Sequence, residues 1–102
     1  MSRIIVRQIT QNATQPGSGG PTLLWDSHGK KYNVDLELFN GAVTLFIAYD
    51  YYELSQLDAV GNPIRGFVLA ANVIKSWLNF RGKIWGACNQ QVEVEVTGWL
   101  AE

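Results

Sequence analysis

The residues best suited to chemistry lie in the segment "DYYE", Asp50 to Glu53, where two carboxylates bracket two tyrosines. Carboxylates serve as general acids and bases, and tyrosine offers a large contact area with a hydrogen-bonding tip. The segment is predicted to end a strand, so Asp50 and Tyr52 share one face and Tyr51 and Glu53 share the other. Residues on opposite faces cannot converge on one small substrate. The segment is therefore expected to form a contact surface.

Other nucleophiles and metal ligands are few. The chain has one histidine, His28, in a predicted turn, and one cysteine, Cys88, in a different predicted hairpin. A lone cysteine excludes an internal disulfide, and this pair is too small a set for a zinc site. Glu93 and Glu95 lie about 7 Å apart on one predicted strand, a spacing that suits a divalent ion, but alternating Val and Glu is typical of any half-exposed strand. The sequence predicts no catalytic residue, no metal site and no cofactor.

The segment from Gln11 to Pro21 is rich in glycine, proline and amides and predicts a long loop. Its backbone N–H groups could cradle an anion, but phosphate loops also use a helix start and a lysine, and neither follows here. A flexible linker is the main expectation, with ligand or partner contact as the alternative at four residues: Gly17, Ser18, Gly19 and Gly20.

Composition limits the classes of function. The 102 residues are expected to form one domain, with 47% apolar and only 17% charged side chains, against roughly 25% charged in typical soluble domains. A formal charge of -1 gives no basic surface for nucleic acid. The longest apolar runs fall far short of the roughly 18 residues that span a membrane. With no secretion signal at the N-terminus, we expect a cytoplasmic or virion-associated protein that contacts neither nucleic acid nor membrane.

Two glycine-containing pairs predict hairpin loops. Asn40-Gly41 is flanked by alternating apolar residues, and His28-Gly29 occupies a similar place upstream. The predicted result is a three-stranded antiparallel meander, Thr22 to Asp26, Lys30 to Phe39 and Ala42 to Tyr52, in which Lys31 faces Asp50. Its register places one set of side chains on a shared core face: Leu23, Trp25, Tyr32, Val34, Leu36, Leu38, Val43, Leu45, Ile47 and Tyr49.

The rest of the chain adds strands and one ambiguous segment. Arg3 to Thr10 predicts a first strand, and "KIWGAC" with "QVEVEVTGWL" predicts a final hairpin. Residues 68–80 fit a helical period with Gly82 at the stop, and a strand pair is the alternative. The predicted fold is mainly β to α+β, an antiparallel meander or sandwich-like sheet of five to seven strands with one helix packed on it.

Low charge and many aromatic residues favour a protein that covers its surface with a partner. The second face of the meander includes Phe39 and Phe46, and the C-terminal "VEVTGWLAE" resembles in general pattern the last strand of trimeric jelly-roll or tail-associated assemblies, without a family motif. The leading hypothesis is a non-enzymatic, homo-oligomeric structural or adaptor protein, with a phage-type viral subunit as one candidate. The alternative is a carbohydrate- or nucleotide-binding protein. Both would use the same residues: Asp50, Tyr51, Tyr52, Phe39, Phe46 and Gly17 to Gly20.

Overall fold

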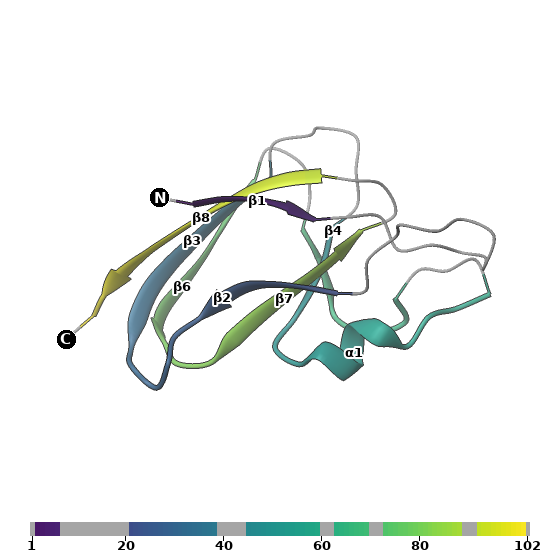
Figure 1. Cartoon of the computed structure of the whole chain (residues 1–102), viewed down its shortest axis with the longest axis horizontal. Coiled ribbons are helices and arrows are strands. Elements are labelled where there is room, and N and C mark those ends of the chain that lie inside the picture. Colours follow the sequence, from purple (N-terminus) through teal and green to yellow (C-terminus); the bar gives the residue numbers. More distant parts are fainter. Residues whose placement is uncertain are drawn as a thin grey trace.

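Two antiparallel four-stranded sheets pack face to face in the computed structural model (Figure 1). The structure describes residues 2–6, by their backbone alone, and 21–38, 45–59, 63–69, 73–88 and 92–101. The first sheet has the order β1 (Ser2–Val6), β8 (Val92–Leu100), β3 (Tyr32–Leu38), β6 (Ile74–Phe80). The second has the order β2 (Thr22–Asp26), β7 (Lys83–Cys88), β4 (Leu45–Ala48), β5 (Phe67–Leu69), and a short helix α1 (Tyr51–Ser55) follows β4. The predicted mainly β, sandwich-like class is confirmed, with eight described strands instead of five to seven.

The core lies between the two sheets and follows the alternation of each strand. Strand β3 is the clearest case, because Val34, Leu36 and Leu38 are buried and the residues between them are not. One apolar cluster joins both sheets: Leu24, Val34, Leu36, Leu38, Leu45, Ile47, Leu69, Trp77, Ile84, Cys88, Val94 and Val96. Each aliphatic side chain of this size contributes about 1.5 to 3 kcal/mol when fully buried. The predicted core face is thus confirmed for the residues of β3 and β4, whereas Tyr49, just after β4, is exposed and Val43 lies outside the described residues.

The predicted meander is wrong in its strand pairing. Strand β3 pairs with β6 and β8, β2 pairs with β7, and β4 pairs with β5 and β7, so neither predicted hairpin forms a ladder. The physical reason is that alternation shows which face of a strand is buried but not which strand lies beside it. A connection that crosses from one sheet to the other buries the same side chains. The predicted pair of Lys31 with Asp50 is lost with this ladder, and Asn40-Gly41 lies outside the described residues.

The turn at His28-Gly29 does form, although it joins the two sheets. His28 has φ 50° and Gly29 has φ 82°, both in the left-handed region that the loop requires. Upstream of this turn, a bulge between Leu23 and Trp25 shifts the register of β2. The bulge buries Leu24 in place of Leu23, which is exposed, contrary to the predicted core face.

The predicted helix at residues 68–80 is also wrong, because β5 and β6 occupy this part of the chain. Strand β6 buries Trp77 between the exposed Ser76 and Leu78, which is a period of two. Branched and aromatic side chains fit a pleated sheet well, and that preference prevailed over the helical spacing. Gly82 lies in the β6–β7 turn with φ 150° and does not end a helix. The alternative, a strand pair, is right about the element type, but β5 pairs with β4 and β6 pairs with β3.

The terminal strands show the same exchange of partners. Strands β7 and β8 do not form the predicted final hairpin, because β7 lies between β2 and β4 and β8 lies between β1 and β3. The predicted first strand is described over Ser2–Val6, which pairs antiparallel with β8. No helix in the described residues is long and apolar enough to cross a membrane.

Aromatic side chains close the β5–β6 side of the sandwich. Trp77 Nε1 donates a hydrogen bond to the hydroxyl of Tyr49 at 2.8 Å, and the ring of Tyr49 lies 5.9 Å from that of Phe67 and 5.6 Å from that of Phe80. The Nζ of Lys75 lies 5.7 Å from the centre of the Phe67 ring. These contacts link β6 of one sheet to β5 of the other, so both edge strands border the same side of the molecule.

Candidate functional site

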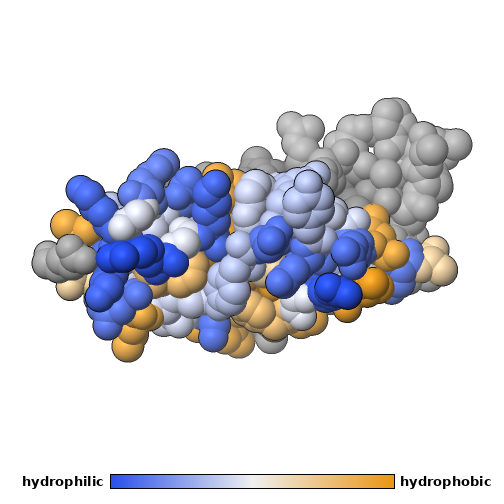
Figure 2. Space-filling model, turned by 90° about the horizontal axis from the view of Figure 1, so that it is seen from below, coloured by the Kyte–Doolittle hydropathy of each residue, from blue (hydrophilic) through white to orange (hydrophobic). Residues whose placement is uncertain are grey.

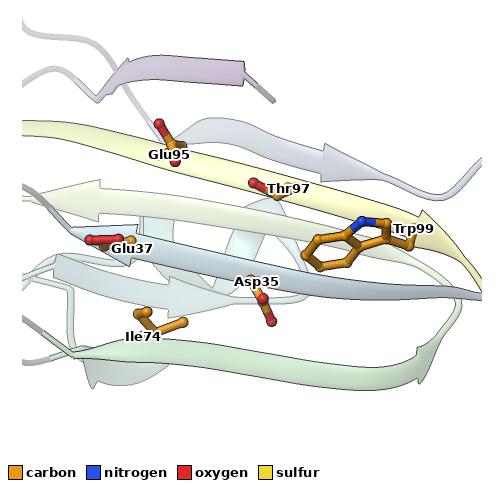
Figure 3. Close-up of a pocket in the computed structure, with 6 residues that line it drawn as sticks. All are labelled: Asp35, Glu37, Ile74, Glu95, Thr97 and Trp99. Carbon is orange, nitrogen blue, oxygen red and sulfur yellow. The ribbon is translucent and has the colours of Figure 1, made fainter.

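A groove lies on the outer face of the first sheet, across β8, β3 and β6 (Figure 3). Because strand side chains alternate, burial of Val34 and Leu36 turns Asp35 and Glu37 outward, and burial of Val94 and Val96 does the same for Glu95 and Thr97. The hollow has a volume of about 200 Å³ and six lining residues: Asp35, Glu37, Ile74, Glu95, Thr97 and Trp99.

The groove is acidic at one end and aromatic at the other, as Figure 3 shows. In the antiparallel register, Glu37 lies directly opposite Glu95, and Asp35 lies opposite Thr97. Like charges directly opposite one another destabilise a sheet, so this pair requires a compensating interaction. The register also places Arg3 of β1 opposite Glu95. The carboxylate of Glu37 forms no hydrogen bond or ion pair with another residue that the structure describes.

Asp35 and Trp99 give the middle and the end of the groove. The Ser76 hydroxyl donates a hydrogen bond to Asp35 Oδ1 at 2.7 Å, which fixes one carboxylate oxygen and leaves the other for a ligand. Trp99 is 53% exposed, so much of its indole is open to solvent. Carboxylates accept hydrogen bonds and attract cations, and an indole face binds cations or the apolar face of a sugar. The groove can therefore bind a ligand, but the described residues offer no nucleophile there.

The segment "DYYE" is placed differently from the prediction. Strand β4 ends at Ala48, and Asp50 caps the N-terminus of α1 by accepting a hydrogen bond from the Tyr52 N–H at 2.8 Å. The predicted strand end with two faces is thus wrong, because a helix starts there. Tyr51 packs edge-on against Trp85, with ring centroids 5.3 Å apart, while Tyr52 is 73% exposed. The two tyrosines remain accessible as contact residues.

The other predicted contact residues fall into two groups. Phe46 is half-buried and packs against a small cluster under α1 that contains Ala48, Leu54 and Ala87. This packing leaves Phe46 less accessible than the tyrosines. Phe39 and the loop of Gly17, Ser18, Gly19 and Gly20 lie outside the described residues.

The histidine and the cysteine lie apart. His28 is exposed in the β2–β3 turn, with Nδ1 3.8 Å from the Asp26 carboxylate. Cys88 is buried at the far end of β7 from Lys83, which pairs with Asp26. Five residues of strand separate these ends by about 17 Å, so the two side chains do not meet. Among the described residues, no three His, Cys, Asp or Glu side chains are placed to hold a metal ion.

A second candidate surface lies along the β5–β6 side. Strand β5 pairs only with β4 and β6 only with β3 in the described part of the chain, so each has one edge of unpaired backbone groups. Large apolar side chains on or next to these strands face outward, Val68 from the second sheet and Ile74 and Leu78 from the first, and Ile74 also lines the groove. Four such residues have 57% to 78% of their surface exposed: Ile64, Val68, Ile74 and Leu78. We refer to these four residues as the apolar edge.

Comparison with known proteins does not identify a relative. No family model matches the chain, and neither a curated protein nor a solved structure shows significant similarity to it. The two surfaces themselves must therefore support any assignment of function.

The sequence pattern identifies some of the residues that line the groove but not the groove itself. The predicted core face of Val34, Leu36 and Leu38 implies that Asp35 and Glu37 point away from it, and Glu93 with Glu95 is a predicted carboxylate pair on one strand. Their combination depends on the pairing of β3 with β8, which are separated by more than fifty residues and share no local signal. Trp99 was missed for the same reason.

Proposed function

We propose that this chain is a non-enzymatic assembly protein that associates with copies of itself through the apolar edge. The observation that supports this most directly is the exposure of Val68 and Leu78 beside two unpaired strand edges. Exposed edge strands are templates for pairing with another chain, and proteins that stay monomeric usually protect them with charges, proline or bulges.

The apolar edge has some of this protection, because β5 is only three residues long, the pairing of β6 with β3 is irregular, and Lys75 points inward from β6. Its apolar side chains nevertheless remain exposed. Lys75, the cation on β6, turns toward the rings of Phe67 and Trp77 and does not project from the outer face that Ile74 and Leu78 occupy. A second copy that covers the edge removes apolar surface from water and can satisfy the free backbone groups. Self-association is therefore favoured both by the burial of apolar surface and by the pairing of the free backbone groups.

Mass measured as a function of concentration tests this proposal. Light scattering and sedimentation velocity from low to high micromolar protein should show oligomers of the wild type. The variant Leu78→Lys, which places a charge on β6, should associate more weakly. The matched control is Leu23→Lys, the same type of change on β2, which is the edge strand at the opposite side of the second sheet. Wild-type protein that stays monomeric throughout this range contradicts the proposal. If only the control variant Leu23→Lys loses association, the interface lies on the β2 side instead.

A second candidate function, binding of a carbohydrate or nucleotide, is favoured by the exposed indole of Trp99 beside Asp35. Stacking on an aromatic face combined with hydrogen bonds to a carboxylate suits a sugar ring or a base. A glycan array and a thermal-shift screen with nucleotides test this function, with Trp99→Ala as the variant that should abolish binding. The absence of any hit in both screens argues against it.

A further inference from the structure

Two neighbouring turns form a basic surface at one end of the sandwich. The β2–β3 turn contains Lys30 and Lys31, the β6–β7 turn contains Arg81, and Lys83 is the first residue of β7. The turns are held together, because the Ser27 N–H donates to the Gly82 carbonyl at 2.9 Å and Asp26 pairs with Lys83 in the ladder. All four cationic residues are exposed, and we refer to them as the basic tip.

The basic tip concentrates the charge of the molecule. It contains four of the eight lysines and arginines in the chain. Lys30, Lys31 and Lys83 form no ion pair with other residues in the described ranges. Figure 1 shows both turns projecting from the body, and Figure 2 shows hydrophilic side chains gathered at the same end of the molecule. The tip is therefore a convex, positively charged surface.

The groove has the complementary shape and charge. It is hollow, and Asp35 and Glu37 present carboxylates on the same face of β3, with the Trp99 indole at the end of the groove. Most of its polar lining atoms are acceptors, so a donor-rich cation satisfies them better than a neutral ligand. A lysine ammonium can pair with a carboxylate while its stem lies against the indole face.

We propose that the basic tip of one copy binds in the groove of a second copy. This inference rests on the proposed self-association and adds a second, ionic contact to the apolar edge. The tip and the groove are different surfaces of the same chain, and a head-to-tail pairing of the two is heterologous, so its repetition gives a ring or an open filament. The cation supplied by the neighbour also gives an opposite charge to the Glu37 carboxylate, which has no ionic partner among the residues that the structure describes.

Reversal of charge on each surface tests the pairing. The groove variant is Glu37→Lys, and the tip variant combines Lys31→Glu with Lys83→Glu; circular dichroism must show that each folds like the wild type. At low salt, each variant alone should lose assemblies larger than those formed by the apolar edge, with at least tenfold weaker association. An equimolar mixture should regain them, because each copy then meets a complementary charge. Leu78→Lys should leave the ionic contact in place and remove the apolar one.

Zero-length cross-linking locates the contact directly. A carbodiimide joins a lysine amine to a carboxylate only where the two already touch, and mixing ¹⁵N-labelled with unlabelled protein marks bonds between copies. We expect bonds from Lys30, Lys31 or Lys83 of one copy to Asp35 or Glu37 of another. If the oligomers have the same mass in the wild type and in both charge-reversed variants, or if the cross-links join other residues, this inference is overturned and the proposed function is left intact. A monomeric wild type refutes both. A neutral glycan that binds at Trp99 without affecting assembly assigns the groove to that ligand and also overturns the inference.

Discussion

Gly98 of β8 makes room for an indole from the opposite sheet, and this close approach gives the sharpest stability prediction. The ring of Trp25 lies against Gly98, so an added Cβ would lie 2.6 Å from Cζ2 and 2.7 Å from Cζ3 of that ring, closer than real Cβ contacts allow. The backbone of Gly98 does not require glycine, because its φ is not in the left-handed region. In the folded state, Gly98→Ala therefore acts through steric overlap alone.

The cost follows from what holds the ring in place. Trp25 packs edge-on against Tyr32 with centroids 5.1 Å apart, and its Nε1 donates to the buried Ser27 hydroxyl at 3.0 Å. Overpacking costs about 1 to 3 kcal/mol, and a displaced ring also loses part of an aromatic pair worth about 0.5 to 1.5 kcal/mol and a hydrogen bond worth about 1 kcal/mol. Alanine restricts the unfolded chain and returns about 0.4 to 1 kcal/mol. We expect a net loss of about 2 to 4 kcal/mol.

Chemical and thermal denaturation, followed by circular dichroism, measure this loss. For a domain of 102 residues each kcal/mol lowers Tm by about 5 °C, so a fall of roughly 10 to 20 °C is expected. The control is a double-mutant cycle: in a Trp25→Leu background, Gly98→Ala should cost less than about 1 kcal/mol, because the clashing atoms are gone. An equal cost in both backgrounds, or a change below about 0.5 kcal/mol in the wild type, would refute the packing described for these two residues.

Three further predictions test local contacts. Asp50→Ala should lower the free energy of unfolding by about 0.5 to 2 kcal/mol, because it removes the N-cap of α1, and Asp50→Asn should recover most of this loss in the same denaturation assay. Ser27→Ala should cost about 1 to 3 kcal/mol by removing the acceptor of the Trp25 indole N–H, with Ser76→Ala on the exposed face as a control that costs less than about 1 kcal/mol. Cys88 should react slowly with a thiol reagent in the native protein and fully after denaturation, since it is 1% exposed; a fast native reaction would contradict its place in the core.

Local patterns predicted burial well and pairing badly. The alternation in "YNVDLEL" predicted which side chains of β3 are buried, because a slip of one residue would exchange its two faces. The same pattern is satisfied by any neighbouring strand that offers apolar side chains, so it could not distinguish a hairpin partner from β8, which is far away in the sequence. The prediction of a helix at residues 68–80 was wrong for a related reason. A short apolar run fits both the helical and the strand period, and the tertiary position of β6 at a sheet edge decided the outcome.

The two turns of the basic tip could be predicted from the sequence, whereas the groove could not. Lys30 and Lys31 follow a recognisable turn at His28-Gly29, and Lys83 follows Gly82, so two basic turns could be identified locally. That they lie together depends on the pairing of β2 with β7. The groove needs three strands from distant parts of the chain in register, and no local feature of Asp35 or Trp99 indicates that they share a surface.

The two proposed contacts differ in their physical origin, and salt separates them. Association through the apolar edge depends on the removal of Leu78 and its neighbours from water. Salts such as sulfate are excluded from the protein surface and strengthen this association. Contact of the basic tip with the groove depends on exposed charges, and screening shortens their range from about 30 Å at 0.01 M to about 10 Å at 0.1 M ionic strength. Raising the salt concentration should therefore break the head-to-tail contacts first and leave the smaller, apolar oligomer. If the larger species instead disappears only together with the smaller one, a single interface accounts for both, and the charges of Lys31 and Glu37 play no part in it.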